Sequence, residues 1–163
     1  MADVMKRDTT QDIREAVEDF FKRDNIKHIP FDDHNVATAV YSVDARFGHV
    51  KVFFLANKDR LVLRMILPVS AGEEERDKVA EFLLRANYGL KIGGFDFDFN
   101  DGEISYRISL FCGINDFNPP TYEQIDFSVV VGLMMVEKYG DALGKVIFGM
   151  LDPKEAVESA EAE

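Results

Sequence analysis

Hydrophobic and polar residues alternate most regularly in the segment 94–111, and this alternation predicts a β-hairpin. Its first half, GFDFDF, alternates phenylalanine with aspartate, which is the period-two pattern of a strand with one buried face. Asp101 and Gly102 follow and predict a two-residue turn. The second half, EISYRISLF, returns with apolar residues on one face and serine or arginine on the other.

A two-residue turn determines which residues of the two strands lie opposite each other. With this turn, Phe97 is expected opposite Tyr106, and all apolar pairs of the hairpin then fall on one face. The same register places Asp96 opposite Arg107 on the other face. We therefore predict an ion pair between these two side chains on the solvent side of the hairpin.

The rest of the chain predicts an α+β fold with one domain. The other elements are expected to be a helix at 9–25, strands at 37–44, 47–56 and 60–67, a helix at 72–90 and a helix at 121–150. The order α-β-β-β-α-β-β-α favours an antiparallel five-stranded sheet with helices on one face. Around a domain of residues 9–151, we expect an N-terminal tail at 1–8 and a frayed acidic C-terminal tail at 152–163.

The predicted last helix is apolar on more than one side, with a first stripe that includes Ile125 and Val129. The apolar residues outside this stripe are Phe127, Val130, Val131, Met134 and Met135. A helix of this kind is buried on more than one side, so we predict that these five residues bind protein. Three alternatives remain open for what buries these five residues: a second copy of the chain, a client segment, or the other helices of the same chain. Gly140 and Gly144 are expected to bend or interrupt the helix.

The net charge of −11 and the isoelectric point near 4.7 disfavour binding to nucleic acid or to an anionic membrane surface. Cys112 is the single cysteine, which excludes an intrachain disulfide and fits a reducing compartment. The N-terminus lacks the apolar core of a signal peptide. The longest uninterrupted apolar run is shorter than the ~20 residues that a membrane helix needs. These features together predict a cytoplasmic protein.

Two groups of side chains are candidates for chemistry. Asp32, Asp33 and His34 lie in one loop and, with His28 and His49, include the residue types that bind metals. The aspartates of the hairpin form a second acidic group. Neither group has the spacing of a metal or catalytic motif, so we expect no catalytic residue, no metal and no cofactor. The alternative is a hydrolase-type or metal-dependent enzyme that uses the acidic residues of the 94–111 hairpin or of the 32–34 loop.

Four strings in this order resemble the YbjN family of small bacterial proteins: LVLRMILP at 61–68, KVAEFLLRANYGL at 78–90, GGFDFDFNDGEISYRISLF at 93–111 and MVEKYGDALGKVIFG at 135–149. The resemblance implies a fold similar to that of type III secretion chaperones, which are small, acidic, dimeric proteins that bind an extended client segment. The family carries the label of a sensory-transduction regulator and has no catalytic motif. We therefore expect a non-enzymatic binding or chaperone-like protein, a homodimer that engages a segment of another protein in a regulatory role.

Overall fold

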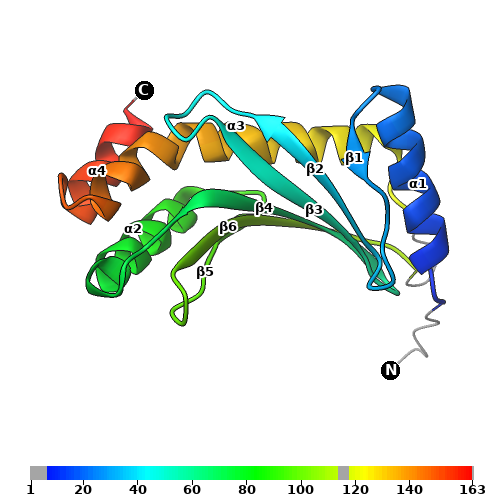
Figure 1. Cartoon of the computed structure of the whole chain (residues 1–163), viewed down its shortest axis with the longest axis horizontal. Coiled ribbons are helices and arrows are strands. Elements are labelled where there is room, and N and C mark those ends of the chain that lie inside the picture. Colours follow the sequence, from blue (N-terminus) through cyan, green and yellow to red (C-terminus); the bar gives the residue numbers. More distant parts are fainter. Residues whose placement is uncertain (1–6, 114–117, 163) are drawn as a thin grey trace.

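A computed structural model describes residues 7–113 and 118–162 of the chain (Figure 1). The described elements are α1 (Thr10–Arg23), β1 (His28–Ile29), β2 (Val36–Ser42), β3 (His49–Ala56), β4 (Arg60–Ser70), the 3-10 helix η1 (Glu73–Glu75), α2 (Arg76–Gly89), β5 (Gly94–Phe97), β6 (Glu103–Phe111), α3 (Tyr122–Ile147) and α4 (Pro153–Glu161). None of these helices combines the length and the apolar content that crossing a membrane requires.

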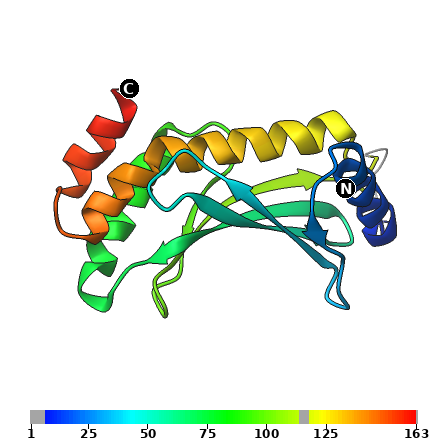
Figure 2. The ribbon, with the colours of Figure 1, turned by 45° about the horizontal axis from the view of Figure 1, so that its top comes forward.

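The strands form one antiparallel sheet in the order β1-β2-β3-β4-β6-β5, which confirms the predicted fold class. The sheet has six strands rather than five, because His28 and Ile29 pair with β2 as an additional short edge strand. Two residues are too few to show a period-two pattern, so this strand has no signal in the sequence. In Figures 1 and 2, α3 runs across one face of the sheet, with α1 at one end and α2 and α4 at the other.

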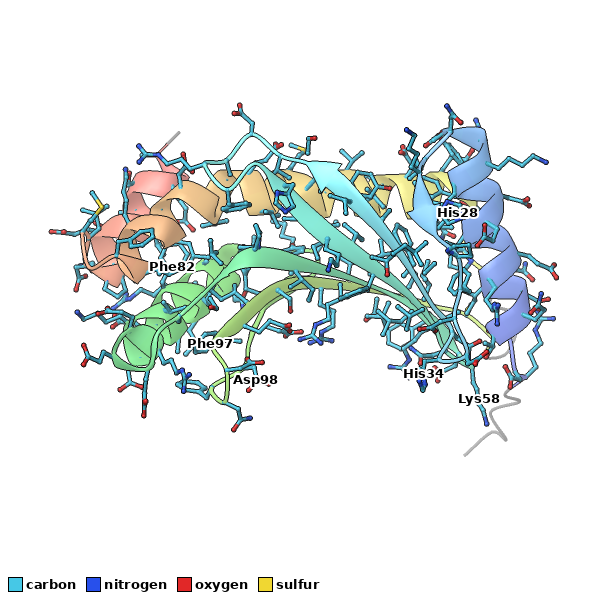
Figure 3. All side chains as sticks on the ribbon, viewed as in Figure 1. His28, His34, Lys58, Phe82, Phe97 and Asp98 are labelled. Carbon is cyan, nitrogen blue, oxygen red and sulfur yellow. The ribbon has the colours of Figure 1, made fainter. Side chains whose placement is uncertain are left out.

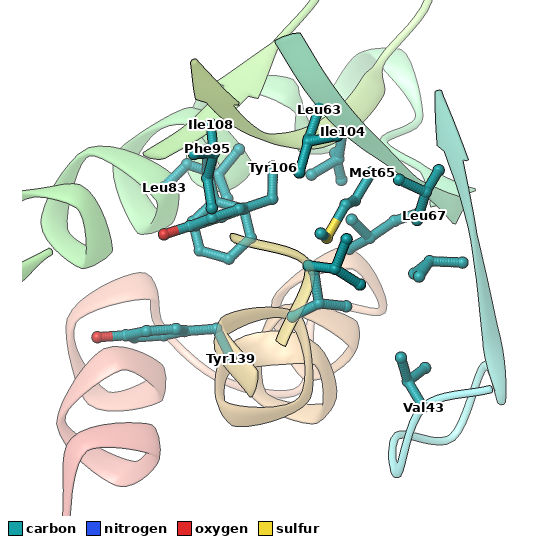
Figure 4. Packing of buried hydrophobic residues seen from close by; sticks show 14 of the residues in the cluster. Val43, Leu63, Met65, Leu67, Leu83, Phe95, Ile104, Tyr106, Ile108 and Tyr139 are labelled. Atoms are coloured by element: carbon teal, nitrogen blue, oxygen red, sulfur yellow. The ribbon is translucent and has the colours of Figure 1, made fainter. Parts of the chain in front are cut away.

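The core lies between α3 and the sheet face that α3 covers. Met65 of β4 and Tyr106 of β6 point toward the helix, and Figure 4 shows them in one cluster with Tyr139 of α3. Gly132 allows this close approach, because a Cβ there would lie 2.3 Å from the Cε atom of Met65. At the other end of the sheet, the aromatic ring of Phe21 packs on β3.

The hairpin forms where it was predicted, but the predicted register is wrong by two residues. Phe97 lies opposite Ile104 rather than Tyr106. The turn is longer than two residues: the Asp98 amide donates to the Glu103 carbonyl at 3.0 Å, and the Gly102 amide donates to the Asp98 carbonyl at 2.8 Å. Because the shift is an even number of residues, each side chain keeps the face that the alternation predicted.

The predicted last helix does form, and it is not interrupted at its glycines. α3 continues through Gly140 and Gly144 to Ile147, so the alternative of an interruption at these glycines is wrong. Its N-terminus has a full capping box, in which the Gln124 amide donates to the Thr121 hydroxyl at 3.2 Å and the Gln124 side chain accepts from the Thr121 amide at 2.9 Å.

The C-terminal segment 152–163 is not a frayed tail as far as the structure describes it. Residues 153–161 form α4, which begins with the Asp152 carboxylate accepting from the Lys154 amide at 2.9 Å. Ala156 and Val157 are buried in the core cluster. Helix α4 packs on α2 and α3, and this contact is the physical reason that the segment folds. Residues 1–6 of the predicted N-terminal tail and Glu163 lie outside the described residues.

Candidate functional site

Three of the five predicted binding residues are exposed on α3 and the other two are partly buried against the core, and we call all five the α3 strip. Phe127, Val130 and Met134 are 55%, 45% and 54% exposed, respectively, and Val131 and Met135 are half-buried. The opposite side of the same helix is buried against the sheet. The described part of the chain therefore leaves Phe127, Val130 and Met134 partly uncovered.

The helix that carries the α3 strip is held along its length. The capping box holds its first turn. Farther along, the link between β2 and β3 is attached to it: the Asp44 amide donates to Glu137 Oε1 at 2.9 Å, and the Arg46 amide donates to Asp141 Oδ1 at 2.8 Å. The strip is thus a preformed surface, and a partner that binds it does not have to order a loop.

Opposite charges stand at the two ends of the α3 strip. Glu123 lies one turn before Phe127, and Lys138 lies one turn after Met134, on the same side of the helix. Within residues 7–113 and 118–162, neither Glu123 nor Lys138 forms an ion pair. Lys138 Nζ lies 5.8 Å from the ring centroid of Tyr139, a cation–π contact that does not neutralise its charge.

The sheet has a second surface without a cover, on the face turned away from α3. Figures 1 and 2 show no described helix across this side. Because side chains alternate along a strand, the residues between the buried positions point to this face. We call the following residues the open sheet face: Val36, Val40, Lys51, Phe53, Leu55, Val62, Arg64, Ile66, Asp96, Glu103, Arg107 and Ser109.

Basic residues gather at the centre of the open sheet face, although the chain carries a net charge of −11. Arg64 and Arg107 lie directly opposite each other on β4 and β6. Arg64 donates to Glu103 at 2.8 Å, and Arg107 pairs with Asp96. Lys51 is exposed and forms no ion pair among the described residues.

The open sheet face is not among the predicted sites, although the sequence contains a signal for it. The strands HVKVFFLA and RLVLRMIL are almost continuous apolar runs rather than alternating ones. Such runs are typical of strands that are covered on both faces. In this structure the helices cover one face only, so the apolar residues on the other face are available for a partner.

The loop 32–34, which was the candidate for a metal site, is organised as a turn. Asp32 Oδ1 accepts from the amides of His34 at 2.8 Å and Val36 at 3.0 Å. The hydrogen bond from Val36 is the main cause that lowers the pKa of Asp32. His28 binds Glu18 instead, at 3.0 Å. In the part of the chain that the structure describes, no three His, Cys, Asp or Glu side chains are grouped as metal ligands.

The acidic residues of the hairpin are also engaged in structural contacts. Asp96 pairs with Arg107, with 2.6 Å between Oδ2 and Nε. Asp98 Oδ1 accepts from the amide of Asn100 at 2.8 Å within the turn. Figure 3 shows Asp98 and His34 at opposite sides of the molecule, so the two acidic groups do not form one site.

Comparison with known proteins agrees with the sequence strings quoted above. A family model matches residues 14–145, and its description is "YbjN: Putative bacterial sensory transduction regulator". A search of curated proteins finds no match to this sequence. The matched range covers most of the chain and includes β1 to β6, α2, the larger part of α1 and nearly all of α3. The chain therefore belongs to the YbjN family.

Proposed function

We propose that this chain is a non-enzymatic regulatory binding protein of the cytoplasm, that it forms a homodimer through the α3 strip and that it engages a segment of another protein. The observation that carries the proposal is the exposure of Phe127, Val130 and Met134 on a helix whose other side is buried. Contiguous apolar surface of this kind marks an interaction site. The description of the family as a regulator supports the same role.

An antiparallel pair of α3 helices makes the α3 strip complementary to itself. In a two-fold symmetric interface, one surface patch serves both subunits. A two-fold axis beside Val130 places Phe127 against the partner's Met134, and Met134 against the partner's Phe127. The same axis places Glu123 against the partner's Lys138 at both ends. One register therefore joins the apolar residues and pairs the two charges at the ends of the strip.

A parallel arrangement of the two helices is disfavoured by the same charges. In a parallel symmetric pair, each residue faces its own copy, so Glu123 would meet the partner's Glu123 and Lys138 would meet the partner's Lys138. Like charges that face each other destabilise an interface. The antiparallel register avoids both contacts, which is why we assign it to the dimer.

The test is a charge exchange measured by size-exclusion chromatography with light scattering. Glu123→Lys alone, or Lys138→Glu alone, creates two like-charge contacts in each dimer. Since an exposed pair contributes about 0.2–1 kcal/mol, either single variant is expected to weaken dimerisation about tenfold. The double variant, Glu123→Lys with Lys138→Glu, restores both pairs with reversed sign and is expected to return close to the wild-type affinity.

Two further variants define the limits of the test. Val130→Glu places a charge at the centre of the strip and is expected to give a monomer with unchanged circular dichroism. Lys22→Glu makes the same change of charge on α1 and is expected to leave dimerisation unchanged. A protein that is monomeric at all concentrations contradicts the dimer. A dimer that neither Val130→Glu nor the single exchanges weaken contradicts the assignment of the interface to α3.

A further inference from the structure

We propose that the open sheet face binds an amphipathic helix of a partner protein, and that this helix carries acidic residues beside its apolar stripe. The inference rests on the proposed function, because it assigns a surface and a chemical class to the engaged segment. It uses a face of the molecule that the α3 dimer leaves free, since α3 lies on the opposite side of the sheet (Figure 2).

The apolar part of the face has the shape and size that a helix covers. Val36, Leu55 and Val62 lie in one row across β2, β3 and β4, and Phe53 is the next residue of β3 on the same face. Three neighbouring strands span about 10 Å, and an α-helix with its side chains is about 10–12 Å wide. Sheets with an apolar face are ordinarily covered by helices, so one helix fits this row.

The charged part of the face determines which helix binds. Arg64 and Arg107 lie opposite each other beside the apolar row, and Lys51 lies on β3 next to Phe53. Glu103 pairs with Arg64 and Asp96 pairs with Arg107, so Lys51 is the one of these three basic residues without an ion pair among the described residues. Carboxylates of a partner would add charge-assisted hydrogen bonds to these donors.

The same charges argue against two other occupants of the face. A second copy of the chain, bound face to face, would bring its own Lys51 to a surface that already carries one, while its Asp96 and Glu103 are already paired with arginines. Such like-charge contacts cost affinity. Nucleic acid is disfavoured by the net charge of −11, because its binding depends on the neutralisation of phosphates by basic residues. An acidic amphipathic helix places no like charge against the basic residues of this face, and its binding does not depend on the neutralisation of phosphates.

The experiment uses two labelled synthetic peptides of about 18 residues, or five helical turns. Both carry the same leucine stripe, flanked by glutamate in one peptide and by lysine in the other. Binding to the full chain is measured by fluorescence anisotropy. The overall charge of the protein favours the lysine peptide, whereas the open sheet face favours the glutamate peptide. We expect the glutamate peptide to bind at least about tenfold more tightly.

Two lysine substitutions test whether the glutamate peptide binds to the open sheet face. Lys51→Glu removes no internal ion pair and is expected to lower the affinity for the glutamate peptide about tenfold. Lys91→Glu, in the connection between α2 and β5, makes the same change of charge and is expected to change the affinity by less than about a factor of two. The inference is overturned if the glutamate peptide does not bind, if the lysine peptide binds equally well, or if Lys51→Glu has no effect.

The outcome is separable from that of the dimer test. The same peptides are added to the Val130→Glu variant, whose open sheet face is unchanged. Binding of the glutamate peptide to that variant supports the sheet-face inference even if the α3 dimer is contradicted. Loss of dimerisation in Lys51→Glu would show that the face is the interface between two copies, and this result would overturn the inference while a homodimer still stands.

Discussion

Asp96 accepts two hydrogen bonds from Arg107, at 2.6 Å from Nε and 3.1 Å from Nη2, although the two residues are not directly opposite each other. Arg107 lies opposite Gly94, and Asp96 lies opposite Ser105. The ion pair therefore crosses the hairpin diagonally. The predicted pair is confirmed although the predicted register is wrong, because the long arginine side chain reaches the diagonal neighbour on the same face.

The Asp96–Arg107 pair is partly exposed, so we expect it to contribute little to stability. Asp96→Asn should lower the free energy of unfolding by about 0.2–1 kcal/mol. Urea denaturation measures this difference, and high salt should reduce it because exposed charges are screened. Asp33→Asn, at an exposed carboxylate without an ion pair among the described residues, is the matched control. A loss above about 2 kcal/mol would instead indicate a buried pair.

Two glycines should respond in opposite directions to replacement by alanine. Gly102 has a φ of 78°, and a Cβ there would lie 2.1 Å from the Ala71 carbonyl oxygen. Gly102→Ala should therefore destabilise the fold by at least about 1–3 kcal/mol. Gly144 is helical, and a Cβ there would meet nothing within 4 Å. Gly144→Ala should stabilise the fold by about 0.5–1 kcal/mol.

Thermal denaturation of these two variants provides the measurement. Gly144 also lines an apolar pocket of about 230 Å³ beside Phe47 and Phe148, so the added methyl group has room. A destabilised Gly144→Ala variant would show that the pocket is tighter than the structure indicates. A Gly102→Ala variant of wild-type stability would contradict the turn geometry of the hairpin.

Cys112 should react slowly with thiol reagents while the protein is folded. Its side chain is fully buried, and its Sγ atom lies 3.3 Å from the Thr9 hydroxyl. Burial raises the pKa of the thiol, so the reactive thiolate is scarce at neutral pH. Labelling with a chromogenic disulfide reagent should be slow in buffer and rapid in denaturant. The labelling rate of Thr9→Val, which lacks the hydroxyl beside Sγ, is compared with that of the wild type. Equal labelling rates in buffer and in denaturant would contradict the burial of Cys112.

Helix α4 should contribute to the stability of the whole domain. Val157 is buried against α2 and α3, so Val157→Ala should cost about 1–3 kcal/mol of unfolding free energy. Ser159→Ala changes an exposed residue of the same helix and should be neutral or slightly stabilising. If residues 152–163 were a detached tail, the two variants would have the same stability as the wild type in chemical denaturation.

The sequence alone indicates three of the helices and five of the strands, together with the faces that they bury. The alternation in the segment 94–111 identified the hairpin and its buried face, and this result survived a register error because a shift of two residues preserves the face. The apolar excess of residues 121–150 identified the α3 strip as surface that the sheet alone does not bury. These features are local, since they depend on the spacing of side chains along one strand or one helix.

The tertiary structure alone decided the features that depend on contacts between distant segments. β1 exists because two residues meet the edge of β2, and α4 is ordered because α2 and α3 offer it a surface. The open sheet face has the same origin. The apolar runs of β3 and β4 indicate two faces that are suited to burial, but only the placement of α3 decides which face is covered. The spacing of apolar residues along a strand or helix determines which of its faces is suited to burial. Contacts between distant segments determine which element buries that face.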